Sequence, residues 1–410
     1  MKILIINQPL NNRGDEAAHK ALVRLLLSKL PDAYFTVLFL QSYSPEGIRQ
    51  FTVDDDRVVY VDIHPGGEFW KIAEEWIDNG RISGWDSSPA LRSMRNFYEA
   101  ADFVICAPGG ICMGAFQDWW HLFYLKFAQI LRKPLIYYGR SFGPFPADTE
   151  RSVRFRDESM ALLHYFSFLS IRDKKTEEIA QKIDGLRYCM TTDVAFLESP
   201  SADIPQEIRA AIGEKQYMVF VPNSLVWHPM YKGKVTKETV VDFYCSVIDI
   251  IQNRHPGLNI VMLPQIFASD DSERDYLFFK EIAAKKQSNN IVVIPDSYSS
   301  DIQQTVIAGS ELLIGARYHS VVFAINQNVP FVALNYEHKI QGLLSALNKQ
   351  DCMVNIMETF SDNSSLQNTL EAIERLLPEI RKDGEAQRKS KEMAGECLDR
   401  LTDFMSGVNR

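Results

Sequence analysis

Apolar runs and helical patterns alternate along the whole chain. In the first half the runs are apolar throughout, at residues 3–6, 35–40, 58–63, 103–107, 134–138 and 166–171. Runs without alternating polar positions are typical of strands that are buried on both faces of a parallel sheet. Between the first two runs, residues 15–30 repeat Ala and Leu at helical spacing, and Pro31 ends that pattern. The first half therefore predicts a parallel α/β domain over residues 1–197.

The same alternation begins again in the second half of the chain. The apolar runs there are residues 218–221, 260–263, 291–294, 312–315 and 331–334. A polar stretch with two prolines, residues 198–216, separates the two halves and is interpreted as a linker. We therefore expect two Rossmann-like α/β domains, residues 1–197 and 217–360, that face each other across a cleft. Helical spacing in residues 361–410 predicts C-terminal helices that pack back on the first domain.

Composition limits the class of protein. The chain has 410 residues, of which 46% are hydrophobic and 24% are charged, as in soluble globular proteins of two or three domains. Its 44 basic and 53 acidic residues give a net charge of -9. This balance argues against a general nucleic-acid binder, because such binding needs clustered Lys and Arg. A local cationic pocket stays open as a possibility.

Cysteine usage and hydropathy bear on the compartment. The six cysteines show no CxxC pair and no metal-ligand spacing, which predicts reduced thiols in the cytoplasm and no metal or organic cofactor. The N-terminal apolar run is too short for a signal peptide, and no stretch of 18 apolar residues would span a membrane. The acidic run at residues 54–56 favours a charged turn over a metal-binding motif.

Ligands of parallel sheets bind beyond the carboxyl ends of the strands, so the residues that follow each predicted strand are candidates. After the first strand, Asn12, Gly14 and Asp15 could form a tight turn and a capped helix start whose N–H groups bind an anion or a sugar hydroxyl. A capped connection without a ligand is an equal alternative. After residues 103–107, Gly109 and Gly110 would let the backbone approach a ligand closely. The tryptophans that follow are interpreted as core.

Two arginines follow neighbouring strands of the first half. Arg140 comes after residues 134–138, and Arg172 after residues 166–171. Their guanidinium groups could converge on one anion, since Arg binds carboxylate and phosphate bidentately. Alternatively, Arg172 pairs with Asp173 or caps a helix.

The most informative segment follows residues 312–315. Arg317, His319 and Ser320 stand at a strand-to-helix corner, where a helix N-terminus attracts anions and a histidine changes its charge near neutral pH. Tyr336 and Lys339 follow the next strand and would reach the same edge of the sheet. A lone histidine is usually structural, but these neighbours favour a functional one.

Taken in order, these motifs resemble those of the polysaccharide pyruvyltransferase family. The resemblance rests on Asn-Arg-Gly-Asp at 12–15, Gly-Gly at 109–110, Ser-Phe-Gly-Pro-Phe at 141–145, Arg-Asp at 172–173, Asp-Val-Ala-Phe at 193–196, Gly-Ala-Arg-Tyr-His-Ser at 315–320, and Pro330 with Tyr336 and Lys339. The chain departs from the family at Arg140, where a glutamine is frequent.

The resemblance implies a GT-B-like fold and transfer of a pyruvyl group from phosphoenolpyruvate to a hexose of a capsular or exopolysaccharide, which forms a cyclic ketal. The acceptor could be a lipid-linked oligosaccharide, with the enzyme at the inner face of the membrane. We expect the first domain to take the acceptor and the second to take phosphoenolpyruvate. His319 and Arg317 are the expected catalytic residues. The expected substrate-binding residues are Arg172, Lys339, Arg140, Asn12, Gly14, Asp15, Gly109, Gly110, Ser320 and Tyr336.

Two other functions remain open from the residues alone. A GT-B glycosyltransferase could hold the ribose of a nucleotide sugar with Glu337 and its diphosphate with Arg317 and Lys339. A sugar-binding protein without turnover could keep the same fold.

Overall fold

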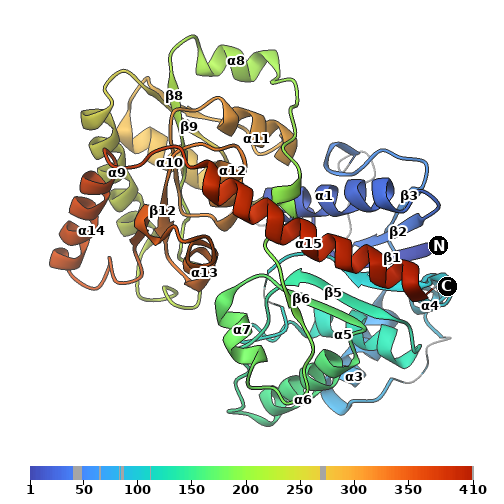
Figure 1. Ribbon diagram of the computed structural model, residues 1–410. Helices are drawn as coiled ribbons and strands as arrows, with labels where there is room; N and C mark the ends of the chain where they lie inside the picture. Colours follow the sequence, from blue (N-terminus) through green and yellow to red (C-terminus); the bar gives the residue numbers. More distant parts are fainter. Residues whose placement is uncertain are drawn as a thin grey trace. The chain divides into compact units, whose positions relative to one another are not determined.

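The computed structural model describes residues 1–39, 49–63, 66–82, 84, 87–110, 112–267 and 274–408. The chain forms two compact units (Figure 1). The first unit contains Met1–Leu10, Ala18–Ala195 and Glu392–Arg410, and the second contains Asn11–Ala17 and Phe196–Lys391. Each unit is therefore built from separate pieces of sequence.

A parallel sheet of seven strands forms the centre of the first unit, in the order β3-β2-β1-β4-β5-β6-β7. The strands are β1 (Lys2–Gln8), β2 (Tyr34–Phe39), β3 (Val58–Val61), β4 (Phe103–Cys106), β5 (Leu135–Arg140), β6 (Phe168–Ile171) and β7 (Cys189–Met190). β4 and β5 are buried along their whole length, as their continuous apolar sequence predicts.

Helices cover both sheet faces in this kind of fold. In the first unit they are α3 (Gly67–Asn79), α4 (Pro89–Ala100), α5 (Trp119–Ile130), α6 (Glu150–Tyr165) and α7 (Lys174–Ala180), with the short 3-10 helices η1 (Arg49–Phe51) and η2 (Val194–Leu197), whose last residues group with the second unit. Their apolar faces pack with the sheet into one core that includes Trp76, Trp119 and Phe123. Trp119 is thus a core residue, as expected from the sequence.

A second parallel sheet has six strands in the order β10-β9-β8-β11-β12-β13. They are β8 (Tyr217–Val221), β9 (Asn259–Met262), β10 (Ile291–Val293), β11 (Leu313–Gly315), β12 (Phe331–Asn335) and β13 (Met353–Asn355). Both sheets follow the Rossmann order, in which the strands run outward in two directions from a central pair. That pair is β1 and β4 in the first unit and β8 and β11 in the second.

The helices of the second unit are α8 (Gln206–Ile212), α9 (Lys237–Arg254), α10 (Asp275–Lys286), α11 (Ser300–Ala308), α12 (Tyr318–Asn326), α13 (His338–Leu347) and α14 (Asn363–Leu376), with η4 (Gln350–Cys352). α14 packs against α9 (Figure 1). Two longer helices, α1 (Arg13–Lys29) and α15 (Gly384–Val408), each contribute residues to both units.

The predicted strands are confirmed, although Leu40, the last residue of one, lies outside the described residues. Two very short strands, β7 and β13, were not predicted. The stretch 198–216 is not a plain linker: it contains α8, whose Ile208 and Ile212 are buried. Of the two C-terminal helices, α14 belongs to the second unit, and only the part of α15 from Glu392 onward groups with the first.

Candidate functional site

Arg317 stands at the carboxyl edge of the second sheet, directly before α12. Its Nη2 donates to Oδ1 of Asp275, and both side chains are buried. Oδ2 of the same carboxylate accepts from the backbone N–H groups of Gln265 and Ile266, each at 3.0 Å. Asp275 therefore fixes the guanidinium of Arg317 relative to the loop after β9, since a buried charge needs both a partner and further hydrogen bonds.

His319 lies in the first turn of α12 and is buried. Its ring packs edge-on against Tyr318 at 5.0 Å between centroids and is tilted against Phe323 at 6.2 Å. On another side it meets the backbone of Gly14, where a Cβ atom would lie only 1.8 Å from Nδ1 of the imidazole. No side chain fits at position 14 while His319 keeps this place.

The segment that carries Asn12, Gly14 and Asp15 belongs to the second unit. Asn12 pairs with Ile266 as an isolated antiparallel bridge, and N–H of Arg13 donates to the carbonyl of Gln265 at 2.8 Å. The structure thus brings this segment to Arg317 and His319. Asp15 does not cap the helix as expected: α1 begins at Arg13, and Oδ1 of Asn12 accepts from N–H of Gly14 at 2.8 Å.

Lys339 follows β12 at the same edge, and its Nζ lies 3.2 Å from Oε1 of Glu337. The other carboxylate oxygen of Glu337 lies 3.5 Å from Nε2 of His228. Burial alone would raise the pKa of Glu337, but the hydrogen bond from His228 and the positive charge of Lys339 lower this pKa to about 2. Glu337 is therefore a fixed negative charge that holds Lys339 in place.

Aromatic rings pack beside these charges. The ring of Tyr336 meets that of His228 edge-on at 5.5 Å, and its carbonyl accepts from the hydroxyl of Tyr231 at 3.0 Å. Trp227 lies under the guanidinium of Arg317, with 5.9 Å from Cζ to the ring centroid. Ser320 turns inward and donates to the carbonyl of Arg317 at 2.6 Å. Its hydroxyl therefore supports the corner.

In the first unit, the side chain of Arg140 contacts the loop that contains Gly109 and Gly110. Its guanidinium donates to the carbonyls of Ala107 and Gly110, the latter at 3.1 Å, and to Sγ of Cys112 at 3.1 Å. A Cβ atom at position 109 would lie 3.0 Å from Nη1 of Arg140. The arginine thus braces the glycine loop after β4.

Arg172 has a different partner from the one considered from the sequence. It pairs with Asp193, and both side chains are buried. Asp173 instead caps α7 through the backbone N–H of Thr176 and accepts a hydrogen bond from the hydroxyl of Ser141. Arg140 and Arg172 thus contact separate protein groups.

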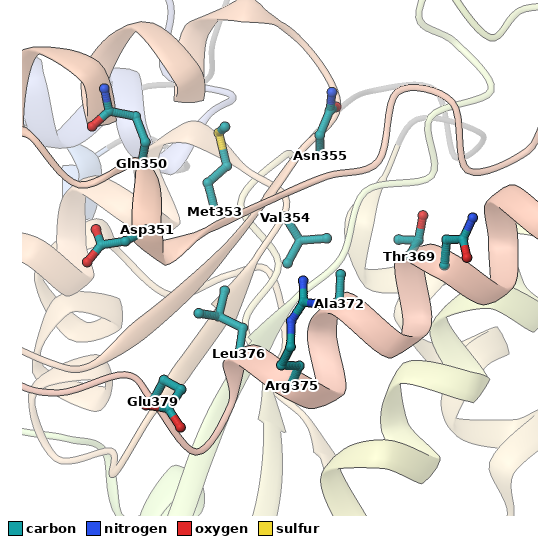
Figure 2. A pocket seen from close by; sticks show the side chains of 11 residues that line it. Gln350, Asp351, Met353, Val354, Asn355, Thr369, Ala372, Arg375, Leu376 and Glu379 are labelled. Atoms are coloured by element: carbon teal, nitrogen blue, oxygen red, sulfur yellow. The ribbon is translucent and has the colours of Figure 1, made fainter.

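Two hollows in the second unit lie away from these residues. One, of about 560 Å³, is formed by η4, β13 and α14 and is lined by residues that include Asp351, Asn355, Arg375 and Glu379 (Figure 2). The other, of about 590 Å³, opens at the amino ends of the strands, between Lys215 and Arg381. None of the predicted site residues is among the described residues that line either hollow.

Sequence reasoning missed Asp275, His228 and Trp227, and it considered Glu337 only for a nucleotide sugar. The segment 222–231, which carries Trp227 and His228, follows β8 directly, so the rule that ligands bind beyond strand ends could have found it. Asp275 starts a helix far from Arg317 in sequence, and no local pattern signals their pairing.

A family model described as polysaccharide pyruvyl transferase matches residues 12–338. The chain belongs to this family. The match begins at Asn12 and ends at His338, so it includes the glycine at 14, the arginines at 140, 172 and 317, and the histidine at 319. It thus covers most of both sheet edges described above, and Lys339 lies one residue beyond its end.

One curated relative of this chain is the amylovoran biosynthesis protein AmsJ of Erwinia amylovora. The two are 24% identical over 246 residues, which cover 58% of this chain and 57% of AmsJ. The match thus spans little more than half of that relative. The family and this relative support a role as a transferase in polysaccharide biosynthesis.

Solved structures show that the pyruvyl transferase chain has a GT-B-like fold. A putative UDP-N-acetylglucosamine 2-epimerase of Listeria monocytogenes matches with a TM-score of 0.61 at 12% identity, over 100% of this chain and 96% of that one. A ugt transferase of Siraitia grosvenorii in complex with UDP matches with a TM-score of 0.60 at 12% identity, over 99% of both chains. At this identity the likeness concerns the fold alone. Within the described residues, no helix has the length and hydropathy needed to cross a membrane.

Proposed function

We propose that the chain transfers a pyruvyl group from phosphoenolpyruvate to two hydroxyls of one hexose in a cell-surface polysaccharide or its lipid-linked precursor. The observation that supports this most is the gathering of Arg317, His319, Lys339 and Gly14 at one sheet edge of a chain that belongs to the pyruvyl transferase family. Phosphoenolpyruvate carries a carboxylate and a phosphate, which need fixed cations.

The chemistry assigns a role to each of these groups. His319 gives a proton to the methylene carbon of the donor, so that the neighbouring carbon becomes an electrophile. One sugar hydroxyl adds to this carbon, and its proton passes to the phosphate group of the donor. The second hydroxyl then forms the second C–O bond, the C–O bond to phosphate breaks, and phosphate leaves with its electron pair. Arg317 and Lys339 neutralise the donor's charge, and His319 takes up a proton in the second step.

The test is turnover with defined substrates. Phosphoenolpyruvate and galactose-terminated acceptors are mixed with the pure protein, phosphate release is followed, and the ketal is identified on the sugar by mass spectrometry and NMR. We expect His319→Ala to lower the rate by about 10²- to 10⁴-fold, the usual contribution of a general acid or base. His255→Ala, which changes a histidine at the far end of α9, is the matched control.

Two results would contradict the proposal. Full turnover of His319→Ala would exclude this residue as the acid. Tight calorimetric binding of a UDP-sugar, with no binding of phosphoenolpyruvate, would replace the pyruvyl donor with a nucleotide sugar.

A further inference from the structure

A buried polar residue stands at or just past the carboxyl end of each of three neighbouring strands of the second sheet. Val221 on β8 lies opposite Gly315 on β11, and Gly315 lies opposite Ala333 on β12. Two residues beyond this level stand Asn223, Arg317 and Asn335, respectively. Asn335 is the last residue of β12, and Asn223 and Arg317 come two residues after the ends of β8 and β11, so all three stand along the carboxyl edge in strand order, where adjacent strands are about 4.8 Å apart. We call this set the Asn223–Arg317–Asn335 row.

All three residues of the row are enclosed, with exposed fractions of 0%, 6% and 0% in that order. Each nevertheless keeps an N–H group without a hydrogen-bond partner among the described residues: Nδ2 of Asn223, Nε of Arg317 and Nδ2 of Asn335. Leaving a buried donor unpaired costs about 1–3 kcal/mol, so native proteins rarely keep one. Three along one sheet edge require an explanation.

The orientation of both amides is fixed by their neighbours. Oδ1 of Asn223 accepts from N–H of Leu225 at 3.1 Å and from the indole N–H of Trp227 at 3.2 Å. Oδ1 of Asn335 accepts from N–H of Gln341 at 3.2 Å. Because these partners are all donors, a flipped amide would place N–H against N–H. The unpaired atoms are therefore nitrogens.

A ligand that satisfies three donors around a guanidinium must supply acceptors and negative charge. A carboxylate or a phosphate does both, and neutral amides bind its oxygens without adding further buried cations, each of which is costly to desolvate. A sugar hydroxyl fits less well, because it also brings a proton that needs an acceptor.

We propose that the Asn223–Arg317–Asn335 row binds oxygens of the donor's carboxylate or phosphate, with Asn223 and Asn335 as binding residues beyond those predicted from the sequence. This inference rests on the proposed function for the identity of the donor. The chemistry of the row is that of an oxyanion site.

The test changes one atom of each amide. Asn223→Asp and Asn335→Asp keep Oδ1 for its present partners but replace the N–H₂ group with an oxygen that repels an anion. We expect each to raise the Kd of phosphoenolpyruvate at least tenfold in calorimetry, while the far-UV circular dichroism spectrum stays that of the wild type. Asn335→Ala removes the amide without adding charge and serves where the Asp variant fails to fold.

Asn355 supplies a matched control. It lies opposite Asn335 on β13, and its Oδ1 accepts from N–H of Met357 at 3.0 Å, but it is exposed and lines the hollow of Figure 2. Asn355→Asp should leave the Kd within twofold of the wild type.

The outcomes separate this inference from the proposed function. If the wild type binds phosphoenolpyruvate and the folded variants of the row bind it equally well, the proposed role of the row is wrong, but the proposed function is not contradicted. If the wild type binds UDP or inorganic phosphate instead, the function fails, and the row stands only if its variants weaken that binding tenfold. Binding of none of the three probes by the wild type would overturn both.

Discussion

The two sheets share one strand order, and each sets a glycine against a nitrogen-bearing side chain at its carboxyl edge, but the buried amide side chains at the strand ends leave opposite atoms unpaired. At the first sheet, the buried side chains of Asn7 and Gln8 donate to backbone carbonyls and keep oxygens without a partner among the described residues. At the second sheet, the Asn223–Arg317–Asn335 row keeps N–H groups. Unpaired oxygens suit hydroxyls, and unpaired N–H groups suit oxyanions.

One charged group, Lys339, also sets the two edges apart. Arg140 donates to the carbonyls of a loop, and Arg172 pairs with a fully enclosed carboxylate, so the cations of the first edge stabilise its structure. In the second edge, Arg317 likewise pairs with the enclosed carboxylate of Asp275, but Lys339 stays one-quarter exposed while Glu337 holds it. Although the two sheets have the same strand order, the cations of the first edge contact protein groups, while the second edge keeps a partly exposed lysine that a ligand could reach.

The largest effect is expected from a substitution at the second edge. Gly14→Ala would place a Cβ atom 1.8 Å from Nδ1 of His319, so the imidazole must move. We expect turnover to fall at least 100-fold, because misplacing a catalytic group by about 1 Å costs that much. Gly257→Ala is the control, since its Cβ would meet nothing within 4 Å. Turnover of Gly14→Ala within threefold of the wild type would show that His319 needs no such contact.

The next effect tests whether the first edge is structural. Arg172→Ala leaves the carboxylate of Asp193 enclosed without its guanidinium partner, which should lower the free energy of unfolding by about 3–5 kcal/mol. The double variant Arg172→Met, Asp193→Leu removes both charges and should recover more than half of this loss in urea denaturation. If Arg172→Ala keeps its stability but loses phosphoenolpyruvate binding, Arg172 is a substrate ligand instead.

The smallest effect sharpens the comparison between the glycines. Gly109→Ala places its Cβ atom 3.0 Å from Nη1 of Arg140, the end of a long side chain that can yield by a few tenths of an ångström. We expect a loss of stability of about 1 kcal/mol or less, measured as a small fall in Tm, with turnover nearly unchanged. A loss of turnover as large as that of Gly14→Ala would make the two edges equivalent.

Much of the fold could be predicted because a strand buried on both faces needs an unbroken apolar run, which the sequence displays directly. β7 and β13 were not predicted, because strands of two or three residues are too short to show an apolar run. The helix α8 was hidden by the polar residues and prolines around it, since only Ile208 and Ile212 face the interior.

Members of the candidate site could be proposed from the sequence where one local motif holds them, as at Arg317, His319 and Ser320. Pairings could not be predicted where the partners come from distant segments, as with Asp275 and Arg317, because pairing there depends on tertiary packing. Arg140 and Arg172 show the same dependence on tertiary packing. Neighbouring strand ends bring two cations close, but each found a protein acceptor of its own.

The contact between Gly14 and His319 also constrains the order of events during synthesis. About 300 residues separate the two in the sequence, so at 5–20 residues per second a ribosome needs about 15–60 s to make the second after the first. During that interval the segment from Asn11 to Ala17 cannot yet pack against the rest of the second unit, which is still being synthesised. A fragment that contains the whole second sheet but starts after Ala17 would lack the backbone of Gly14 that packs against His319.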